Sequence, residues 1–281
     1  MRCLYVDLDG TLLGPGGSLL AGAGGAFALD GVRALQACSR AGVEVVLYSG
    51  RRQSSVFEAA RLLGGSAFIF ELGCGLVLDG ELEWLTGGMV PDAQRGSIYD
   101  QIEASGAPAL LLERYSPRGD GARAGALEYH TPWSVGREIS HLFRGSIEIA
   151  TVAALLDQAG LGWLRLVDNG VVREPSGQMP GMEIVHAYHL IPAAASKARA
   201  VARHMQARGY SRGECIAVGD SREDMDAAPV VGAFWLVANA IEQDPGLESE
   251  VRRRAGVRVA LGRHGAGVYE AVVTTLAEGR R

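Results

Sequence analysis

The sequence predicts an α/β protein with a doubly wound, mostly parallel sheet and an inserted α+β domain. Apolar runs of strand length alternate with amphipathic helices in residues 1–80, and the same alternation returns in 190–281. Residues 81–189 instead contain short apolar runs and turn signals, which are typical of antiparallel strands mixed with helices. We therefore predict one core, 1–80 plus 190–281, interrupted by an insert of 81–189.

The first part of the core begins with the apolar run 3–6, which predicts a buried strand. Apolar residues at helical spacing, each series ending at glycine, predict helices at 29–41 and 54–63. The other strands expected in this part are 43–48 and 67–70. The glycine-rich segment 14–25 carries no lysine, so it is not a phosphate-binding P-loop, and we expect a mobile flap or a linker.

In and beside the insert, turn residues between apolar runs predict two hairpins. The turn signals are Asp79-Gly80, within 76–85, and Asp168-Asn169-Gly170, between strands at 163–167 and 171–173. The remaining strands expected here are 110–112, 127–129, 147–149 and 182–188. The helices expected here lie near 92–104 and at 152–159.

The second part of the core returns to the doubly wound alternation. Its expected helices are 194–208, which Gly209 stops, a short one from Arg222, and 266–277. Its expected strands are 215–218, 233–237 and 257–261.

The composition is that of an ordinary globular protein. Hydrophobic residues make up 48% of the 281 residues, and no apolar run approaches the ~20 residues of a membrane span. A formal net charge of −5 argues against a nucleic-acid or membrane-binding surface. The four cysteines are scattered and no signal peptide pattern is present, so we expect reduced thiols in a cytoplasmic protein. The sequence does not specify an oligomeric state.

The strongest chemical signal is Asp7-Leu8-Asp9-Gly10-Thr11, directly after the first strand. Two carboxylates at i and i+2, where a strand ends in a glycine turn, can face one small space outside the sheet. There one carboxylate can attack phosphorus while the other moves a proton, and the pair suits a divalent metal. For this segment alone, a strand followed by an ordinary Asx turn remains the structural alternative.

Three further signals follow strands or begin helices of the predicted core. Ser49-Gly50-Arg51 follows the second strand and offers a hydroxyl and N–H groups to a phosphate, although a helix cap would look the same. Lys197 is the single lysine among 27 basic residues, which indicates a place where a guanidinium does not fit. Asp220 and Asp224 can both face a cation, unless Asp220 is only a cap. Open α/β sheets bind their ligands at such strand ends.

Together, and in this order, the four signals resemble the haloacid dehalogenase-like superfamily of phosphoryl-transfer enzymes, which has a Rossmann-like core. The resemblance implies that Asp7 is the nucleophile, Asp9 the general acid and base, and Lys197 the cation that neutralises charge. It implies phosphate binding by Ser49 and Gly50. It also implies a Mg²⁺ ion at Asp7, the backbone carbonyl of Asp9, Asp220 and Asp224.

The insert lies where the class II caps of this superfamily are inserted, and it resembles the α/β caps of Cof-type and mannosyl-3-phosphoglycerate phosphatases. The resemblance implies that it closes over the site and selects the substrate. The residues considered for substrate contact are Arg51, Glu71, Arg114 and Arg173. Other candidates in the insert, each more often structural, are His130, Arg137, His141, Arg144 and Arg165. Glu71 and Glu223 replace asparagines of the Cof-type pattern, which leaves the substrate open.

We therefore expect a Mg²⁺-dependent phosphatase acting on a small phosphorylated metabolite such as a sugar or polyol phosphate. A phosphosugar mutase on the same core is the alternative. A non-catalytic binding protein is a third hypothesis, which the presence of every acidic and lysine position disfavours.

Overall fold

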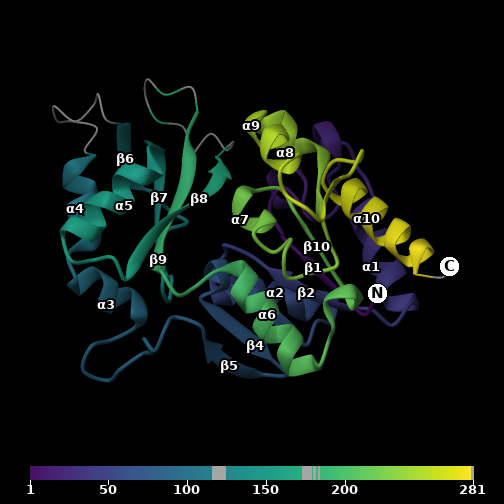
Figure 1. The fold of residues 1–281 in the computed structure, drawn as a ribbon, viewed down its shortest axis with the longest axis horizontal. Helices are drawn as coiled ribbons and strands as arrows, with labels where there is room; N and C mark the ends of the chain where they lie inside the picture. Colours follow the sequence, from purple (N-terminus) through teal and green to yellow (C-terminus); the bar gives the residue numbers. More distant parts are fainter. Residues whose placement is uncertain (116–124, 173–178, 180–181, 183, 280–281) are drawn as a thin grey trace. The chain divides into compact units, whose positions relative to one another are not determined.

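The computed structural model describes residues 1–115, 125–172, 179, 182 and 184–279. The chain forms two compact units, one of Met1–Glu83 with Ser196–Arg281 and one of Trp84–Ala195. We call them the core and the insert (Figure 1). The sequence-based boundary at 190 lies too early, because residues 190–192 end a strand that pairs only with strands of the insert.

The core is built around one sheet with the strand order β12-β11-β10-β1-β2-β3-β4-β5. The strands are β1 (Cys3–Val6), β2 (Glu44–Tyr48), β3 (Ala67–Phe70), β4 (Gly75–Leu78), β5 (Glu81–Trp84), β10 (Cys215–Gly219), β11 (Ala233–Leu236) and β12 (Val257–Val259). All pairs from β12 to β3 are parallel, and β4 is antiparallel to β3. The predicted α/β fold class is confirmed.

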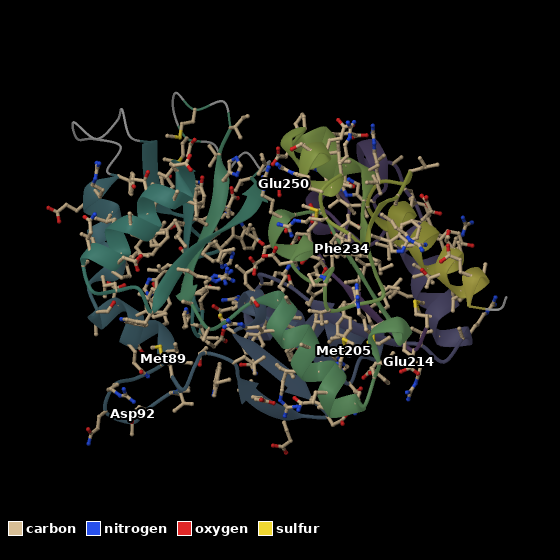
Figure 2. The ribbon with its side chains drawn as sticks, in the orientation of Figure 1. Met89, Asp92, Met205, Glu214, Phe234 and Glu250 are labelled. Carbon is tan, nitrogen blue, oxygen red and sulfur yellow. The ribbon has the colours of Figure 1, made fainter. Side chains whose placement is uncertain are left out.

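Helices flank this sheet. They are α1 (Asp30–Arg40), α2 (Gln53–Leu63), α6 (Lys197–Arg208), α7 (Arg222–Met225), α8 (Ala238–Gln243), α9 (Gly246–Val251) and α10 (Gly265–Glu278). Figure 1 shows α1 and α10 side by side, and α6 lies against β3 and β4. Phe234 of β11 is fully buried, whereas Glu214 lies at the core surface (Figure 2). The sequence analysis missed α8 and α9, which are both only six residues long.

The insert contains a four-stranded sheet in the order β6-β7-β9-β8, with antiparallel pairs throughout. Its strands are β6 (Gly125–Tyr129), β7 (His141–Ile147), β8 (Leu164–Val171) and β9 (His186–Pro192). Its helices are α3 (Ile98–Ala104), α4 (Ala107–Arg114) and α5 (Ile149–Gln158). The inserted α+β unit is thus present as expected.

Three local predictions in the insert were wrong. Residues 110–112 lie in α4 and not in a strand, because a short leucine run fits a helix face as well as a buried strand. The run 147–149 spans the end of β7 and the start of α5. The strand expected at 182–188 begins only at His186.

The expected hairpin at Asp168-Asn169-Gly170 is also wrong. These residues lie inside β8, whose pairing with β9 shifts register between Asp168 and Val171. Asp168 Oδ1 accepts a hydrogen bond of 2.8 Å from the Gly170 amide, and Gly170 has φ of 97°. The turn-forming residues therefore produce a bulge within a strand and not a reversal of the chain.

The glycine-rich segment 14–25 is folded into two turns. Short 3-10 helices occupy Pro15–Gly17 and Ala23–Gly25, and the amides of Gly14 and Gly22 donate to the carbonyls of Ser18 and Ala26. The flap prediction identified an irregular segment but not its ordered turns. Among the described residues, no helix is both long and apolar enough to cross a membrane.

Candidate active site

Three carboxylates meet at the carboxyl edge of the core sheet. Asp7 follows β1 and Asp220 follows β10, and these parallel strands are in register at Val6 and Val218, so the two aspartates leave the sheet side by side. Asp224 joins them from α7. One carboxylate oxygen of each residue lies within 4.8 Å of the others. The three aspartates lie together, as expected for residues that follow the carboxyl ends of neighbouring parallel strands.

Lys197 is the cation of this cluster. Its Nζ donates to Asp7 Oδ1 at 2.7 Å and to Asp224 Oδ1 at 2.6 Å, and it lies 4.8 Å from the centre of the Tyr48 ring. The side chain is 1% exposed. A compact ammonium fits between two carboxylates and an aromatic face, where a planar guanidinium would need more room. This enclosure accounts for the single lysine in the chain.

The ionisation of the cluster shows an excess of negative charge. Burial raises the pKa of Asp7 to about 7 although Lys197 opposes it, and burial together with the charges of Asp7 and Asp224 raises the pKa of Asp220. Burial alone would lower the pKa of Lys197, but Asp224 and Asp7 outweigh it and raise that pKa. One ammonium therefore does not neutralise three buried carboxylates.

The residues present fit a hard divalent cation, because carboxylate oxygens with surplus negative charge are its preferred donors. Asp7 and Asp220 are the best placed. Both oxygens of Asp224 are already used: Oδ1 by Lys197, and Oδ2 by the amides of Asp220 and Ser221 and the hydroxyl of Ser221. Asp224 is therefore suited to hold Lys197 and the Asp220 turn in position beside the metal site.

Two glycines permit the close packing of this edge. Gly10 has φ of 80°, and a Cβ there would lie 2.1 Å from Asp220 Oδ2. Gly73 has φ of 87°, and a Cβ there would lie 2.2 Å from the carbonyl oxygen of Ser196, just before Lys197. The turn after β3 therefore packs directly on the start of α6, which fixes the position of Lys197.

Asp9 does not join the carboxylate cluster. Its side chain is 56% exposed and forms a bidentate ion pair with Arg51, at 2.6 Å from Nε to Oδ2 and 2.5 Å from the terminal nitrogen to Oδ1. Gly17 of the folded glycine-rich segment lies against this pair, since a Cβ there would be 3.2 Å from the guanidinium. Arg51, considered only as a substrate contact from the sequence, holds the expected acid and base.

Ser49 and Gly50 lie at the carboxyl edge of the neighbouring strand β2 and are buried. Ser49 Oγ accepts a hydrogen bond of 3.2 Å from the Arg51 amide, and the Ser49 carbonyl accepts one from Leu72. Glu71 is fully buried in a turn of positive φ, and its amide donates to the Arg51 carbonyl. These hydrogen bonds connect the turn after β2 to the turn after β3.

Two residues that the sequence did not single out, Asn239 and His264, hold the Asp9-Gly10-Thr11 turn. Asn239 Nδ2 donates to the Gly10 carbonyl at 2.8 Å, and His264 Nδ1 lies 2.9 Å from the same oxygen. Thr11 Oγ1 donates to Asp220 Oδ1 at 2.9 Å. Asn239 follows β11, the next strand after β10, so the strand-end argument applied once more would have found it.

Two of the residues predicted to contact the substrate, Arg114 and Arg173, belong to the insert. Arg114 ends α4, is exposed and lies over the ring of Tyr115, 5.5 Å from its centre. Arg173 lies outside the described residues. The contacts of Arg114 do not mark a substrate site.

Arg144 and His130 of the insert form a second candidate site for substrate contact, and we call these two residues the basic group. Arg144 of β7 pairs with Glu128 of β6, at 2.6 Å. The ring of Tyr99 in α3 stacks on the ring of His141. Because side chains alternate along a strand, Arg144 points to the opposite face of the sheet. Among the described residues, Arg144 Nη1 and the buried His130 Nδ1 have no hydrogen-bond partner. Burial, together with Arg144 and Arg137, lowers the pKa of His130 to about 4.

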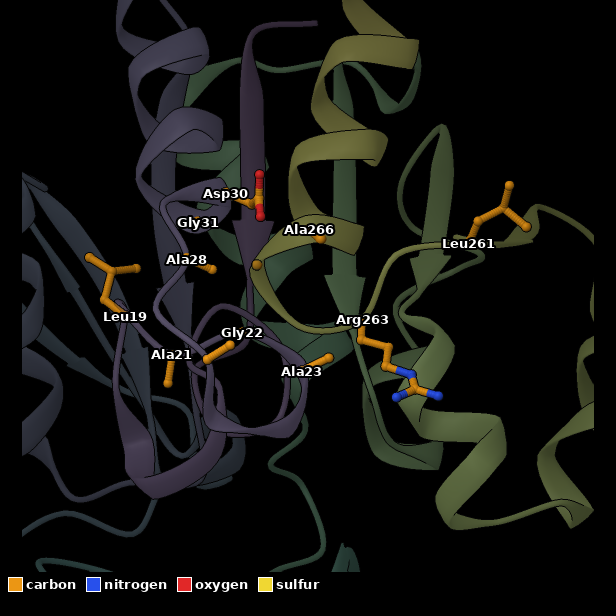
Figure 3. Close-up of a pocket in the computed structure, with 12 residues that line it drawn as sticks. Leu19, Ala21, Gly22, Ala23, Ala28, Asp30, Gly31, Leu261, Arg263 and Ala266 are labelled. Atoms are coloured by element: carbon orange, nitrogen blue, oxygen red, sulfur yellow. The ribbon is translucent and has the colours of Figure 1, made fainter.

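An apolar pocket of the core is separate from the carboxylate cluster. Figure 3 shows its lining, which comes from the glycine-rich segment, the start of α1 and the loop before α10. Asp30 and Arg263 are its charged members, and none of the expected catalytic residues lines it. Its position gives it no part in the chemistry of Asp7.

Comparisons with known proteins agree with this geometry. No family model matches the chain. A phosphoglycolate phosphatase of Pyrobaculum neutrophilum is 28% identical over 99% of this chain and 97% of that protein. One of Halorubrum lacusprofundi is 26% identical over 84% of both.

Solved structures share the fold over nearly the whole chain. Thermoplasma acidophilum 0175 covers 98% of both chains with a TM-score of 0.62 at 15% identity. The sucrose-phosphatase of Synechocystis, in complex with sucrose and phosphate, covers 98% of both with a TM-score of 0.60 at 15% identity. A haloacid dehalogenase-like hydrolase of Bacteroides thetaiotaomicron covers 97% of this chain and 98% of that one, with a TM-score of 0.58 at 17% identity.

The core sheet and the insert thus have the fold of the solved haloacid dehalogenase-like hydrolase, and three carboxylates and one lysine gather at the carboxyl edge of that fold. The two curated relatives, which this chain resembles over most of its length, are both named as phosphatases.

Proposed function

We propose that this protein is a Mg²⁺-dependent phosphatase that hydrolyses a small phosphorylated metabolite through an aspartyl-phosphate on Asp7. The observation that carries the proposal is the buried Lys197 ammonium, which joins Asp7 to Asp224 at 2.7 and 2.6 Å beside Asp220. A surface ion pair does not need such enclosure, whereas transfer of a charged phosphoryl group does.

Asp7 acts as the nucleophile. Lys197 holds its Oδ1, so the other carboxylate oxygen is available to attack phosphorus. The new oxygen–phosphorus bond forms as the bond from phosphorus to the leaving alkoxide breaks. Lys197, already in place, then neutralises charge on the transferred group without having to move. Asp7 and Asp220 would hold a Mg²⁺ ion, which would supply further neutralisation of the phosphoryl charge.

Asp9 acts as the general acid and then as the general base. It gives a proton to the leaving alkoxide and later takes one from the water that hydrolyses the aspartyl-phosphate. Because both of its oxygens accept from Arg51, Asp9 is ionised in this arrangement, so it has to release at least one of these hydrogen bonds and take up a proton from solvent before it acts as the acid. Arg51 then becomes available to an anionic oxygen of the substrate.

For the substrate, we propose a phosphate monoester whose leaving group carries a carboxylate, as in phosphoglycolate. The two curated relatives bear that name. The basic group around Arg144 and His130 suits a carboxylate, since both side chains retain an unused buried nitrogen. The sugar or polyol phosphate expected from the cap resemblance is the competing substrate class, and a phosphosugar mutase is the competing reaction.

The test is release of inorganic phosphate by the purified full-length protein with Mg²⁺. The substrates are 2-phosphoglycolate, phosphorylated sugars and polyols, and each is also followed for isomerisation. We expect 2-phosphoglycolate to give the highest kcat/KM, EDTA to abolish turnover, and Asp7→Asn to abolish it as well. Asp30→Asn, at a half-buried helix-start aspartate on α1, is the matched control and should retain activity.

Full activity of Asp7→Asn would refute the proposed mechanism. Preference for a sugar phosphate would refute only the substrate. Conversion between isomeric sugar phosphates without phosphate release would establish the mutase instead.

A further inference from the structure

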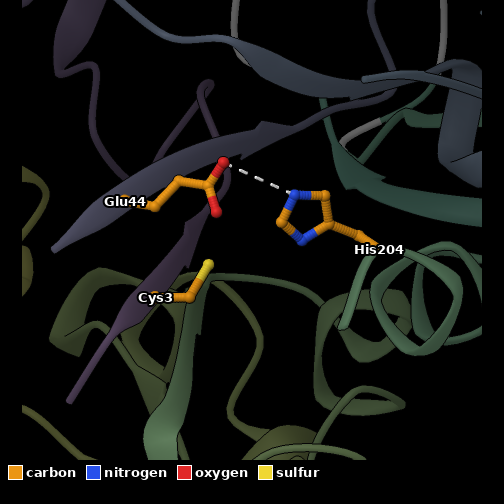
Figure 4. A group of neighbouring side chains, drawn as sticks. All are labelled: Cys3, Glu44 and His204. Atoms are coloured by element: carbon orange, nitrogen blue, oxygen red, sulfur yellow. Dashed lines mark ion pairs between the residues drawn. The ribbon is translucent and has the colours of Figure 1, made fainter. Parts of the chain in front are cut away.

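A second cluster of possible metal ligands lies at the amino edge of the core sheet, the edge opposite the carboxylates. Cys3 begins β1, and its register partners on the two neighbouring strands are Glu44 of β2 and Cys215 of β10. His204 of α6 lies over the same side of β1, because its ring contacts Tyr5. Figure 4 shows Cys3, Glu44 and His204 converging on one point.

The geometry of these side chains is close to that of a metal site. One ligand atom from each of Cys3, Glu44 and His204 lies within 4.8 Å of the others. His204 Nε2 is 3.7 Å from Glu44 Oε1. In a tetrahedral zinc site with bonds of about 2.0–2.1 Å, a nitrogen and an oxygen ligand are separated by about 3.4 Å. The His204–Glu44 pair is therefore within a few tenths of an ångström of the separation that a shared ion requires.

An unused nitrogen points into this cluster. His204 is fully buried, and its Nδ1 pairs with the Tyr5 hydroxyl at 2.7 Å. Its Nε2 has no hydrogen-bond partner among the residues that the structure describes. A buried polar atom without a partner is costly, and a metal ion would satisfy it. The Tyr5 contact would at the same time fix the ring and its tautomer, as partners of metal-binding histidines commonly do.

We propose that Cys3, Glu44 and His204 bind a thiophilic divalent cation such as Zn²⁺, with Cys215 as the fourth ligand. The mixed sulfur, nitrogen and oxygen donors suit Zn²⁺ and not Mg²⁺, which prefers oxygen alone. The ion would join β1, β2, β10 and α6 and would have no part in phosphoryl transfer.

The charges around the cluster are compatible with a cation. Although burial acts in the opposite direction, His204, Tyr210 and Arg208 lower the pKa of Glu44 to about 2, so this ligand is already ionised. Burial and the neighbouring Cys215 raise the pKa of the Cys3 thiol, which would lose its proton on binding the metal. Arg208 contacts Glu44 Oε1 at 3.1 Å and the Tyr210 hydroxyl donates to Oε2 at 2.9 Å, so the ion would share Oε1 with Arg208. Asp79 pairs with the same guanidinium at 2.7 Å and offsets its charge.

The alternative is that His204 and Glu44 form only a buried ion pair. The two cases differ in one spectroscopic property. Co²⁺ bound by a thiolate gives a sulfur-to-cobalt charge-transfer band, whereas Co²⁺ bound by carboxylates alone does not. Titration of the full-length protein with Co²⁺, under reducing conditions and with excess Mg²⁺ to fill the catalytic edge, therefore reports this cluster separately.

We expect the wild-type protein to show the thiolate band with one Co²⁺ per chain and to lose it when Zn²⁺ is added. Cys3→Ser should reduce the band to about half, because the Cys215 thiolate remains, and the double variant Cys3→Ser/Cys215→Ser should abolish it. His204→Gln should weaken Co²⁺ binding by roughly 100-fold or more. Tyr5→Phe, which removes only the partner of Nδ1, should weaken it by about tenfold. Cys38→Ser, at a buried thiol of α1, and Asp7→Asn should leave the band unchanged.

The wild-type measurement alone decides the proposal if a variant does not fold. Absence of a thiolate band in the folded wild-type protein would overturn the metal site, and so would a band that Cys3→Ser leaves intact in a folded protein. Either result would favour the simple ion pair. Neither result bears on the phosphatase mechanism, since the catalytic edge uses none of these residues.

Discussion

The carboxyl edge of the core and the basic group of the insert both concentrate charge, but they pair it differently. At the core edge Lys197 contacts two carboxylates, and the turns around it are held by hydrogen bonds from Asn239 and Thr11. Within the part of the insert that the structure describes, Arg144 pairs with Glu128, and both Arg144 and His130 have a buried nitrogen without a hydrogen-bond partner. The core edge is therefore organised before a ligand binds, whereas the basic group of the insert has hydrogen-bonding capacity left for one.

Removal of Lys197 should have the largest effect. Lys197→Met leaves Asp7 and Asp224 buried without their cation, so we expect kcat/KM to fall at least about 10³-fold. The loss of a buried ion-pair partner should also cost about 3–5 kcal/mol of stability. Activity at saturating Mg²⁺ and urea unfolding measure the two effects.

Arg203→Met, on the same helix but in an exposed pair with Glu83, is the control and should change neither quantity much. Lys197→Arg keeps the positive charge and tests whether the buried site has room for a guanidinium. If it retained wild-type activity, the argument that a guanidinium does not fit there would be wrong.

Loosening the Asp9–Arg51 pair should have the next largest effect. Arg51→Lys cannot supply the two parallel N–H groups that orient this exposed carboxylate. We expect kcat to fall by about 10- to 100-fold, because a misplaced proton donor costs that much. Steady-state kinetics beside Arg61→Lys, an exposed control on α2, make the measurement. An unchanged kcat would mean that Asp9 is positioned by something other than Arg51.

The sequence predicted the core better than the insert for a physical reason. In the core, buried parallel strands are continuous apolar runs, and chemistry gathers at their carboxyl ends, so Asp7, Asp220 and Asp224 were brought together correctly. What the sequence could not show is which hydrogen bonds those groups make. The pairing of Asp9 with Arg51, and the use of both Asp224 oxygens within its own turn, depend on distances that no motif encodes.

In the insert, short apolar segments have no such signature. Leu110–Leu112 suits a helix as well as a strand, and Asp168-Asn169-Gly170 suits a bulge as well as a turn; only packing against neighbouring elements decides. The basic residues of the insert were equally ambiguous, because pairing and burial, not residue type, separate Arg144 from the exposed Arg114.

The substrate role of the insert gives a smaller predicted effect. Arg144→Ala should raise KM for 2-phosphoglycolate about tenfold, the equivalent of about 1.4 kcal/mol, with little change in kcat. A phosphate ester with an uncharged leaving group should be unaffected. Arg114→Ala, at the exposed end of α4, is the matched control. An equal rise in KM for both substrates would show that Arg144 does not recognise the carboxylate.

A comparably small predicted effect is the pH dependence of stability that His130 contributes. Burial and the nearby Arg144 and Arg137 lower its pKa from 6.5 to about 4, so the unfolded chain binds more protons between these values. Stability should therefore fall as pH decreases from about 6.5 to 4, by about 1–2 kcal/mol once solvent screening is allowed for. Urea unfolding of wild type and His130→Gln at pH 7.5 and pH 4 isolates this contribution, because the variant lacks the titrating ring.

A carboxylate ligand bound beside His130 would favour the protonated form of His130 and reduce the loss of stability at low pH. If glycolate left the difference between wild type and variant unchanged, the basic group of the insert would be a structural feature and not a substrate site.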